Sequence, residues 1–284
     1  MPTIDNRWGL PDLGLGVGFR TKHFQHVLDE RPAVDWLEII SENFMDTGGR
    51  PSWVLDQASA HYPVVMHGVS LSIGSTDPLD FEYLRKLDRL AQRCRAVWIS
   101  DHFCWTGVAG KNGHDLFPIP CTEQSLRWVV DRVRAVQDFL GRPLLLENPS
   151  NYIEFRESTI PEPIFIRRVA EQADCALLFD VNNVYVTCRN FGLDPMTYLD
   201  EIPYDRVVQI HLAGHTDKGT HCIDTHDAPV IDEVWQLYAE VMRRAGPRAT
   251  MVEWDDHIPE FEVVHAEVRK AAAFRETVMQ DARG

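Results

Sequence analysis

Seven apolar segments of the chain end alike, because each runs into a His, carboxylate or Asn side chain. The clearest is MVEWDDH, in which Glu253 and Asp255 follow an apolar run. A carboxylate at the end of a buried strand is costly to keep without a partner. We therefore expect these strand ends to build one metal site. The other six segments are EIISEN ending at Asn43, VVMHG ending at Gly68, VWISDH ending at His102, LLLEN ending at Asn148, LLFDVNN ending at Asn183 and VVQIHLAGH ending at His215.

These segments, together with GLGVGF at 14–19, predict eight strands, each followed by a helix or a helical loop. Such alternation is typical of a parallel sheet. Eight units in 284 residues indicate a (β/α)₈ TIM barrel, an α/β fold that often reaches this size as one domain. We expect a single domain over residues 1–284, with the barrel covering about 14–279. The glycines of 14–19 could form a nucleotide loop, but close backbone approach at a barrel strand is favoured.

Local patterns predict several element boundaries. Asp77 and Pro78 resemble an N-cap and a first helical residue. The sixth strand is expected to run through Asn183, and one last helix to cover 259–279. Residues 103–120 are predicted to be irregular, and a loop of that length is usually a lid or a binding loop, although an ordered surface excursion is the alternative.

Composition narrows the partners and the compartment. The net charge of −15 would repel nucleic-acid phosphates, so we expect no nucleic-acid partner. No apolar run approaches the roughly 18 residues of a membrane span, and the first residues lack the order of a signal peptide. Six cysteines without a CxxC pair are typical of reduced thiols. These features predict a cytoplasmic protein without a membrane partner.

Eight His and carboxylate residues are the candidate metal ligands. Each alone has an ordinary explanation, such as a hydrogen-bonded core histidine or a loop-capping glutamate. Six at the ends of different strands and two in one loop favour a metal site instead. Eight ligands exceed the six of one octahedral ion, so about two or three ions bridged by carboxylates fit better. The candidates are His67, His102, Glu147, Asp180, His211, Asp224, His226 and Glu253, with Glu147 and Glu253 as the expected bridges.

A second group of polar residues could bind directly or orient a ligand through a hydrogen bond. These residues are Asn43, Asn148, Asn183 and His215. The orienting role is favoured, least clearly for Asn183. His61, His114, His221 and His257 are expected on the surface. Cys104, Cys188 and Cys222 could meet a thiol substrate, although spare buried thiols are commoner.

At this point the motifs carry a resemblance. The chain resembles the multinuclear non-haem iron-dependent oxidases, the family that includes the methanobactin-biosynthesis oxidase. The resemblance runs from about Gly14 to Asp255, nearly the whole chain. It is carried, in order, by SENFM, MHGVSLSIG, SDHFCW, LLLENPSNY, FDVNNVYV, QIHLAGH, DTHDAPV and VEWD.

The resemblance implies a xylose isomerase-like barrel that holds two or three irons as mixed Fe²⁺/Fe³⁺. It implies dioxygen as co-substrate and oxidation of cysteine residues in a ribosomally made precursor peptide. A separate peptide-recognition protein is a common partner in the family. By motif, the eight candidate ligands take the iron-ligand roles, with Glu147, Asp180, His211 and Glu253 as the catalytic core of the site.

Two other functions remain open at this point. One is a two-metal sugar isomerase or hydrolase, such as an apurinic endonuclease, on the same barrel with redox-inert ions. The acidic charge counts against the DNA-directed version. The other is a metal-binding partner protein without turnover. The identity of the bound metal would distinguish the first alternative from an iron oxidase. Consumption of dioxygen in the presence of a peptide would distinguish the second.

Overall fold

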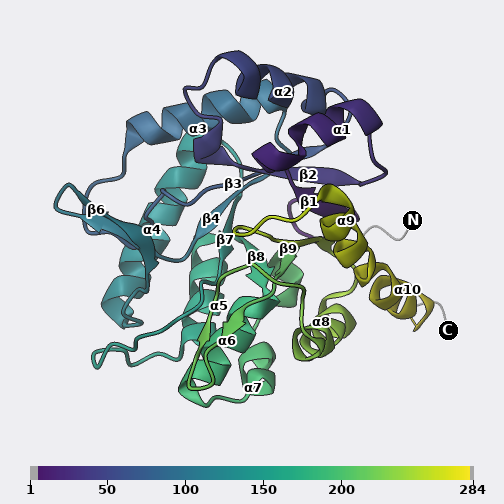
Figure 1. The fold of residues 1–284 in the computed structure, drawn as a ribbon. Helices are drawn as coiled ribbons and strands as arrows, with labels where there is room; N and C mark the ends of the chain where they lie inside the picture. Colours follow the sequence, from purple (N-terminus) through teal and green to yellow (C-terminus); the bar gives the residue numbers. More distant parts are fainter. Residues whose placement is uncertain (1–5, 282–284) are drawn as a thin grey trace.

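The structure, a computed structural model, describes residues 6–281. Eight parallel strands form a closed barrel in the order β1-β12-β9-β8-β7-β4-β3-β2, and helices surround it (Figure 1). The predicted TIM barrel is therefore confirmed, whereas the single domain over 1–284 extends beyond the described residues and stays a prediction. The barrel strands are β1 Leu15–Gly18, β2 Trp36–Ile40, β3 Val64–His67, β4 Ile99–His102, β7 Leu144–Glu147, β8 Ala176–Asp180, β9 Val207–Leu212 and β12 Ala249–Val252.

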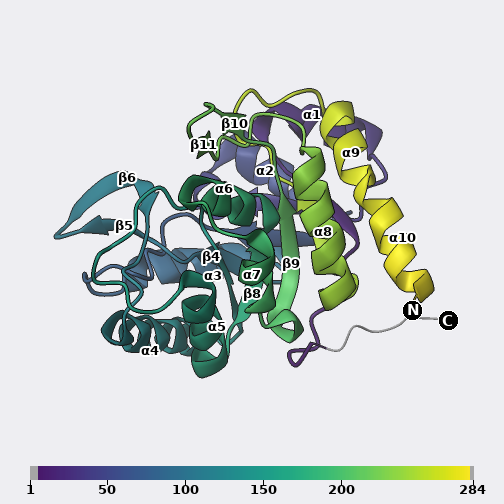
Figure 2. The same ribbon diagram turned by 90° about the horizontal axis from the view of Figure 1, so that it is seen from below.

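The helices pack an apolar face against the outside of the barrel, and α8, α9 and α10 lie together along one side (Figure 2). They are α1 Phe24–Glu30, α2 Gly49–Ser59, α3 Phe81–Cys94, α4 Glu123–Leu140, α5 Glu162–Ala173, α6 Val181–Phe191, α7 Pro195–Asp200, α8 Asp232–Ala245, α9 Phe261–Arg269 and α10 Ala271–Asp281. Short 3₁₀ turns cover Thr21–His23, Ser41–Asn43 and Tyr204–Arg206. Within residues 6–281, no helix combines the length and apolar character needed to cross a bilayer.

The interior of the barrel is layered because alternate residues of a strand point to the same side. Its lower layer is a separate apolar cluster that includes Trp36, Val65, Leu145, Leu178 and Met251. The residue two places further along each of these strands is polar and buried. Those residues are Glu38, His67, Glu147, Asp180 and Glu253. The apolar floor thus directs one ring of polar side chains to the carboxyl ends of the strands.

The first strand needs its glycines for close packing. A Cβ atom at Gly16 would lie 2.2 Å from the Trp36 ring. This agrees with close backbone approach rather than a nucleotide loop.

Three predicted boundaries are wrong. The helix after β3 starts at Phe81, and its N-cap is Asp80, which accepts hydrogen bonds from the backbone of Glu82 and Tyr83. Asp77 instead accepts hydrogen bonds from the amides of Ala109 and Gly110. The sixth strand stops at Asp180, because that side chain accepts the Asn183 amide at 2.6 Å and caps α6. The last helix is divided into α9 and α10.

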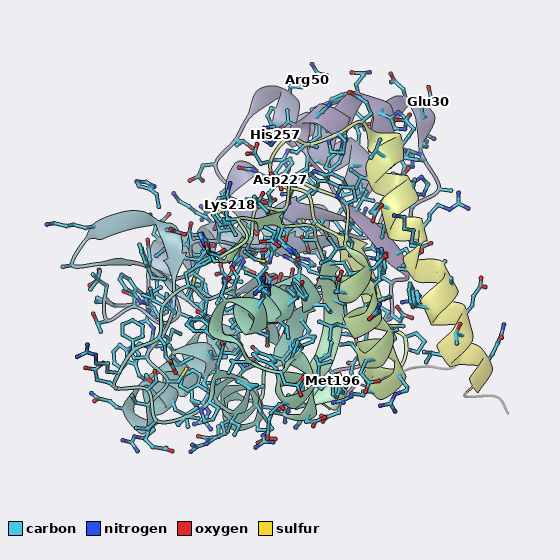
Figure 3. All side chains as sticks on the ribbon, turned by 60° about the horizontal axis from the view of Figure 1, so that its bottom comes forward. Glu30, Arg50, Met196, Lys218, Asp227 and His257 are labelled. Carbon is cyan, nitrogen blue, oxygen red and sulfur yellow. The ribbon has the colours of Figure 1, made fainter. Side chains whose placement is uncertain are left out.

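The prediction that residues 103–120 are irregular is wrong. They contain a two-stranded antiparallel hairpin of β5 Trp105–Val108 and β6 Lys111–Phe117. The Trp105 and Phe117 rings stack across it with centroids 4.5 Å apart. A second small sheet pairs β10 Thr216–Asp217 with β11 Cys222–Ile223. Asp227 follows this small sheet and His257 follows β12, and both are labelled in Figure 3. Asp227 Oδ2 lies 3.9 Å from His257 Nδ1.

Candidate metal centre

Three overlapping clusters of His and carboxylate residues lie at the carboxyl end of the barrel. In each cluster the possible ligand atoms all lie within 4.8 Å of one another. Glu147 belongs to the first and second clusters, and Glu253 to the second and third. The clusters are His67, His102 and Glu147; Glu147, Asp180, His211 and Glu253; and His226, Glu253 and Asp255.

The first cluster aims two imidazoles at one carboxylate oxygen. His67 Nε2 and His102 Nε2 each lie 3.1 Å from Glu147 Oε2. Their Nδ1 atoms are held from behind, by Ser100 Oγ at 2.8 Å for His67 and by the Gly68 carbonyl at 3.1 Å for His102. Such contacts to the second ring nitrogen fix the orientation of metal-binding histidines.

The second and third clusters meet at Glu253. His211 Nδ1 lies 3.3 Å from Glu147 Oε1 and 3.2 Å from Glu253 Oε2. His226 Nδ1 lies 3.3 Å from the same Glu253 oxygen. His226 has a left-handed backbone, φ 46°, which is uncommon outside glycine and is typical of functional sites. Asp224 contacts His226 Nε2 at 2.7 Å but belongs to none of the three clusters among the described residues.

Charge is unevenly balanced among these buried groups. Burial acts to lower the pKa of His67, but Glu147 and other carboxylates outweigh it and raise that pKa to about 9. Burial lowers the pKa of His102. Burial, together with the charge of Glu147, raises the pKa of Asp180 well above its usual value. Burial acts to raise the pKa of Glu147 and Glu253, but neighbouring histidines outweigh it and lower the pKa of both. At Asp180, burial and the charge of Glu147 outweigh the histidines, and a bound cation would favour the ionised form.

Several buried polar atoms of the centre make close contacts but no hydrogen bond of good geometry among the described residues. Buried polar atoms are normally paired, because leaving one unpaired costs about 1–3 kcal/mol. All of them are N or O atoms that bind divalent metals through a lone pair. The residues present therefore fit metal ions. The atoms are Glu147 Oε2, Asp180 Oδ2, Asn183 Oδ1, His211 Nδ1 and His226 Nε2.

Glu38 on β2 was not predicted as a site residue, because the polar end of its segment was placed at Asn43. Its Oε2 accepts the Gln209 amide at 2.6 Å and lies 3.2 Å from His211 Nε2. The Trp98 indole N–H can only donate, and its 2.6 Å bond to Gln209 Oε1 fixes which way that amide points. Glu38 therefore orients His211 from the side opposite Glu147 and Glu253. The alternation of Trp36 and Glu38 along one strand was the signal for it.

Arg20 and Asp255 also support the centre and were not predicted as site residues. The Arg20 guanidinium lies 3.1 Å from Glu253 Oε1 and 2.5 Å from Asp255 Oδ1. Asp255 Oδ2 in turn lies 3.1 Å from His226 Nδ1. The sequence offers no local signal for Arg20, which is 233 positions from Glu253.

The second group of predicted residues divides in the structure. Asn183 lies in the centre, with its Nδ2 bound to the Asn148 carbonyl and its Oδ1 free to bind. Asn148 uses both side-chain atoms on the Asp180 backbone, at 2.9 and 3.0 Å, so it joins β7 to β8. His215 contacts Asn182 at 2.8 Å outside the clusters, and Asn43 is exposed.

The remaining His and Cys expectations agree with the structure. His61, His114, His221 and His257 are exposed. Cys104, Cys188 and Cys222 are buried with free thiols. Cys188 lies on α6 and Cys222 on β11.

Residues 14–276 match the family model described as RiPP precursor modification enzyme MbnB/TglH/ChrH. The chain belongs to this family. The resemblance seen in the motifs is thereby confirmed over nearly the whole chain. Members of the family modify ribosomally made precursor peptides.

Relatives from several bacteria cover almost the same length and are described as UPF0276 proteins. One from Anaeromyxobacter sp. strain Fw109-5 is 55% identical over 260 residues, 92% of each chain. One from Caulobacter vibrioides is 49% identical over 261 residues, 92% of this chain and 93% of the relative.

Solved structures with similar folds are distant in sequence. Endonuclease IV from Thermus thermophilus matches with a TM-score of 0.60 at 15% identity, covering 94% of this chain and 100% of that one. D-Psicose 3-epimerase from Clostridium cellulolyticum matches with a TM-score of 0.59 at 11% identity, covering 95% and 98%. At such identities the likeness shows the barrel fold alone.

Proposed function

We propose that this protein is a non-haem iron oxidase that uses dioxygen to modify cysteine residues of a ribosomally made precursor peptide. The observation that carries the proposal is the sharing of Glu147 and Glu253 between neighbouring clusters. A carboxylate common to two ligand sets can bridge two ions, and two such bridges accommodate about two or three ions. Membership in a peptide-modifying family supplies the substrate class.

The residues of the chain would divide the work as follows. His67, His102 and Glu147 would hold one ion, and Asp180 and His211 a second, with Glu147 bridging. Glu253 and His226 would extend the centre toward Asp224. Iron bound here would supply one-electron chemistry with dioxygen.

The supporting residues would keep this geometry during turnover. Glu38 holds the His211 ring from behind, and Arg20 holds Glu253. The site lies at the end of the barrel where TIM-barrel enzymes bind their substrates, so a peptide would enter from the loop side. A separate protein that recognises the precursor is part of the proposal.

The test combines metal analysis with peptide oxidation. Protein made with iron and kept anaerobic should hold about two or three irons per chain. Dioxygen is then added with a cysteine-containing precursor encoded beside the gene, and with its Cys→Ser variant as control. We expect a mass change and oxygen uptake with the cysteine peptide only.

Each other outcome contradicts a defined part of the proposal. Equal modification of the serine peptide would exclude the thiol as the reacting group. Full iron content without modification of either peptide would favour an isomerase or hydrolase on the same barrel. Iron content below one per chain, with the barrel folded, would refute the iron centre itself.

A further inference from the structure

A large cavity lies outside the barrel, beside α5, α6 and α7, which share one side of the molecule in Figure 1. Its volume is about 770 Å³, which is within the range of small-molecule and side-chain binding pockets. Most of its wall is apolar, with Phe103, Ile119, Phe155 and Phe191 among the lining residues.

The inner end of this cavity adjoins the candidate metal centre. Phe103 directly follows His102, and Pro149 follows Glu147 by two positions. Thr187 lies one turn beyond Asn183 on α6. Its hydroxyl accepts a hydrogen bond from the backbone N–H of Asn151 at 3.0 Å. The Phe103 amide also donates to the Glu147 carbonyl at 2.9 Å, so residues that line the cavity are directly connected to residues of the metal centre.

The charges around the cavity have one sign. Its charged lining residues are all acidic, namely Glu154, Glu162, Asp194 and Glu201. Glu201 is paired with Arg167 at 2.5 Å, and Asp194 caps α7. Glu162 accepts a hydrogen bond from the neutral Tyr198 hydroxyl at 3.3 Å. Burial raises the pKa of Glu162 to about 7, although part of its surface stays exposed.

Asn151 provides another polar atom in the cavity wall. The Oδ1 atom of Asn151 is buried without a donor among the described residues. The rim is apolar and open to solvent, since Ile153 and Leu193 are each 55% exposed. The cavity thus combines an apolar entrance with two inner acceptors, one of them able to carry a negative charge.

We propose that this cavity binds a lysine or arginine side chain of the precursor peptide. The aliphatic stem would pack on the apolar rim, and the cationic end would donate to Glu162 and Asn151. The proposal rests on the proposed function for the identity of the peptide. The acidic excess of the chain, net charge −15, also favours a basic ligand.

Calorimetric titration of the full chain tests this with cysteine-free peptides. The probes are acetyl-Gly-Leu-Arg-Leu-Gly-amide and the same peptide with Gln in place of Arg. We expect the arginine peptide to bind about ten-fold more tightly, because its donors meet a charged acceptor. Glu162→Gln should remove that difference while keeping the shape of the side chain.

Two further variants control the result. Glu171→Gln changes an exposed residue of the same helix outside the cavity and should leave both affinities unchanged. Leu193→Gln changes the exposed rim, carries little risk to folding, and should weaken both peptides. Iron content should not change in any variant.

Three outcomes would overturn the proposal. Equal affinity for the two peptides would assign the cavity to a neutral apolar ligand. Arginine preference that persists in Glu162→Gln would place the basic site elsewhere, and absence of binding would exclude a basic side chain as occupant. Because the probes contain no cysteine and need no turnover, these results are independent of whether the oxidase activity is found.

Discussion

Glu38 and His211 face each other inside the barrel, with Glu38 Oε2 3.2 Å from His211 Nε2. The opposite ring nitrogen, Nδ1, points to Glu147 and Glu253 at 3.3 and 3.2 Å. The His211 imidazole thus lies between Glu38, which orients it, and two carboxylates that would bind the same metal ion. A metal on Nδ1 requires the ring proton on Nε2, where Glu38 Oε2 can accept it, although the Gln209 amide nitrogen also lies 2.7 Å from Nε2.

Glu38→Gln should weaken metal binding while leaving the barrel folded. The amide can still fill the space, but it no longer draws the His211 proton to Nε2. Loss of such a partner typically lowers metal affinity about 10–100-fold. Competition with a chelator measures the affinity, and circular dichroism checks the fold. Exposed Glu82→Gln on α3 is the matched control. Wild-type affinity in Glu38→Gln would show that this contact has no role in metal binding.

Glu147→Gln and Glu253→Gln should each remove more metal than Asp255→Asn. Each of the two glutamates belongs to two clusters, whereas Asp255 belongs to one and is exposed. Removing one bridging carboxylate should therefore lower the content of two ions together, by about one ion or more per chain. Elemental analysis after gel filtration gives the ratio. A larger loss in Asp255→Asn than in either glutamate variant would contradict the bridging assignment.

Arg20→Leu should destabilise metal-free protein more than metal-loaded protein. The change removes the Arg20 cation from buried Glu253, and breaking a buried ion pair in this way costs roughly 3–5 kcal/mol. A bound metal would replace part of the lost positive charge. Urea unfolding with and without metal measures both values.

Lys22→Leu provides the comparison for Arg20. Lys22 pairs with Glu260 at 2.9 Å on the surface, and such pairs contribute about 0–1 kcal/mol. If Arg20→Leu cost no more than Lys22→Leu in metal-free protein, the Arg20–Glu253 contact would not stabilise the fold.

The stability of the chain should depend on pH through Glu162. Its pKa is raised by burial from 4.5 to about 7, so the folded state keeps a proton that the unfolded state releases in this range. That contribution is full below pH 4.5 and is lost as pH rises toward 7. Glu162→Gln lacks this titration, so it should gain roughly 1–3 kcal/mol relative to wild type between pH 5 and 8. Thermal unfolding across this range checks it, and a constant difference would show that Glu162 titrates normally.

Much of the fold followed from local pattern. Apolar runs that end in polar side chains identified the alternating elements, because such signals act over a few residues. The caps of α4, Thr122 and Gly141, are signals of the same short range. The hairpin within 103–120 was missed because its strand β6 is largely exposed and polar, with no apolar alternation. Asp77 was predicted as the N-cap because Pro78 follows it, and only the tertiary structure gives Asp77 other amides to bind and leaves Asp80 to cap α3.

By itself, the sequence determined which side chains lie at the strand ends, since a period of two along a buried strand separates the apolar floor from the polar ring. Only the tertiary structure decided which of them meet. Closure of the barrel brings Glu38 to His211, which is 173 positions away, and Arg20 to Glu253. It also brings the β7–α5 segment to α6 and α7 to form the acidic cavity. These contacts depend on strand order and barrel closure, which no local residue pattern encodes.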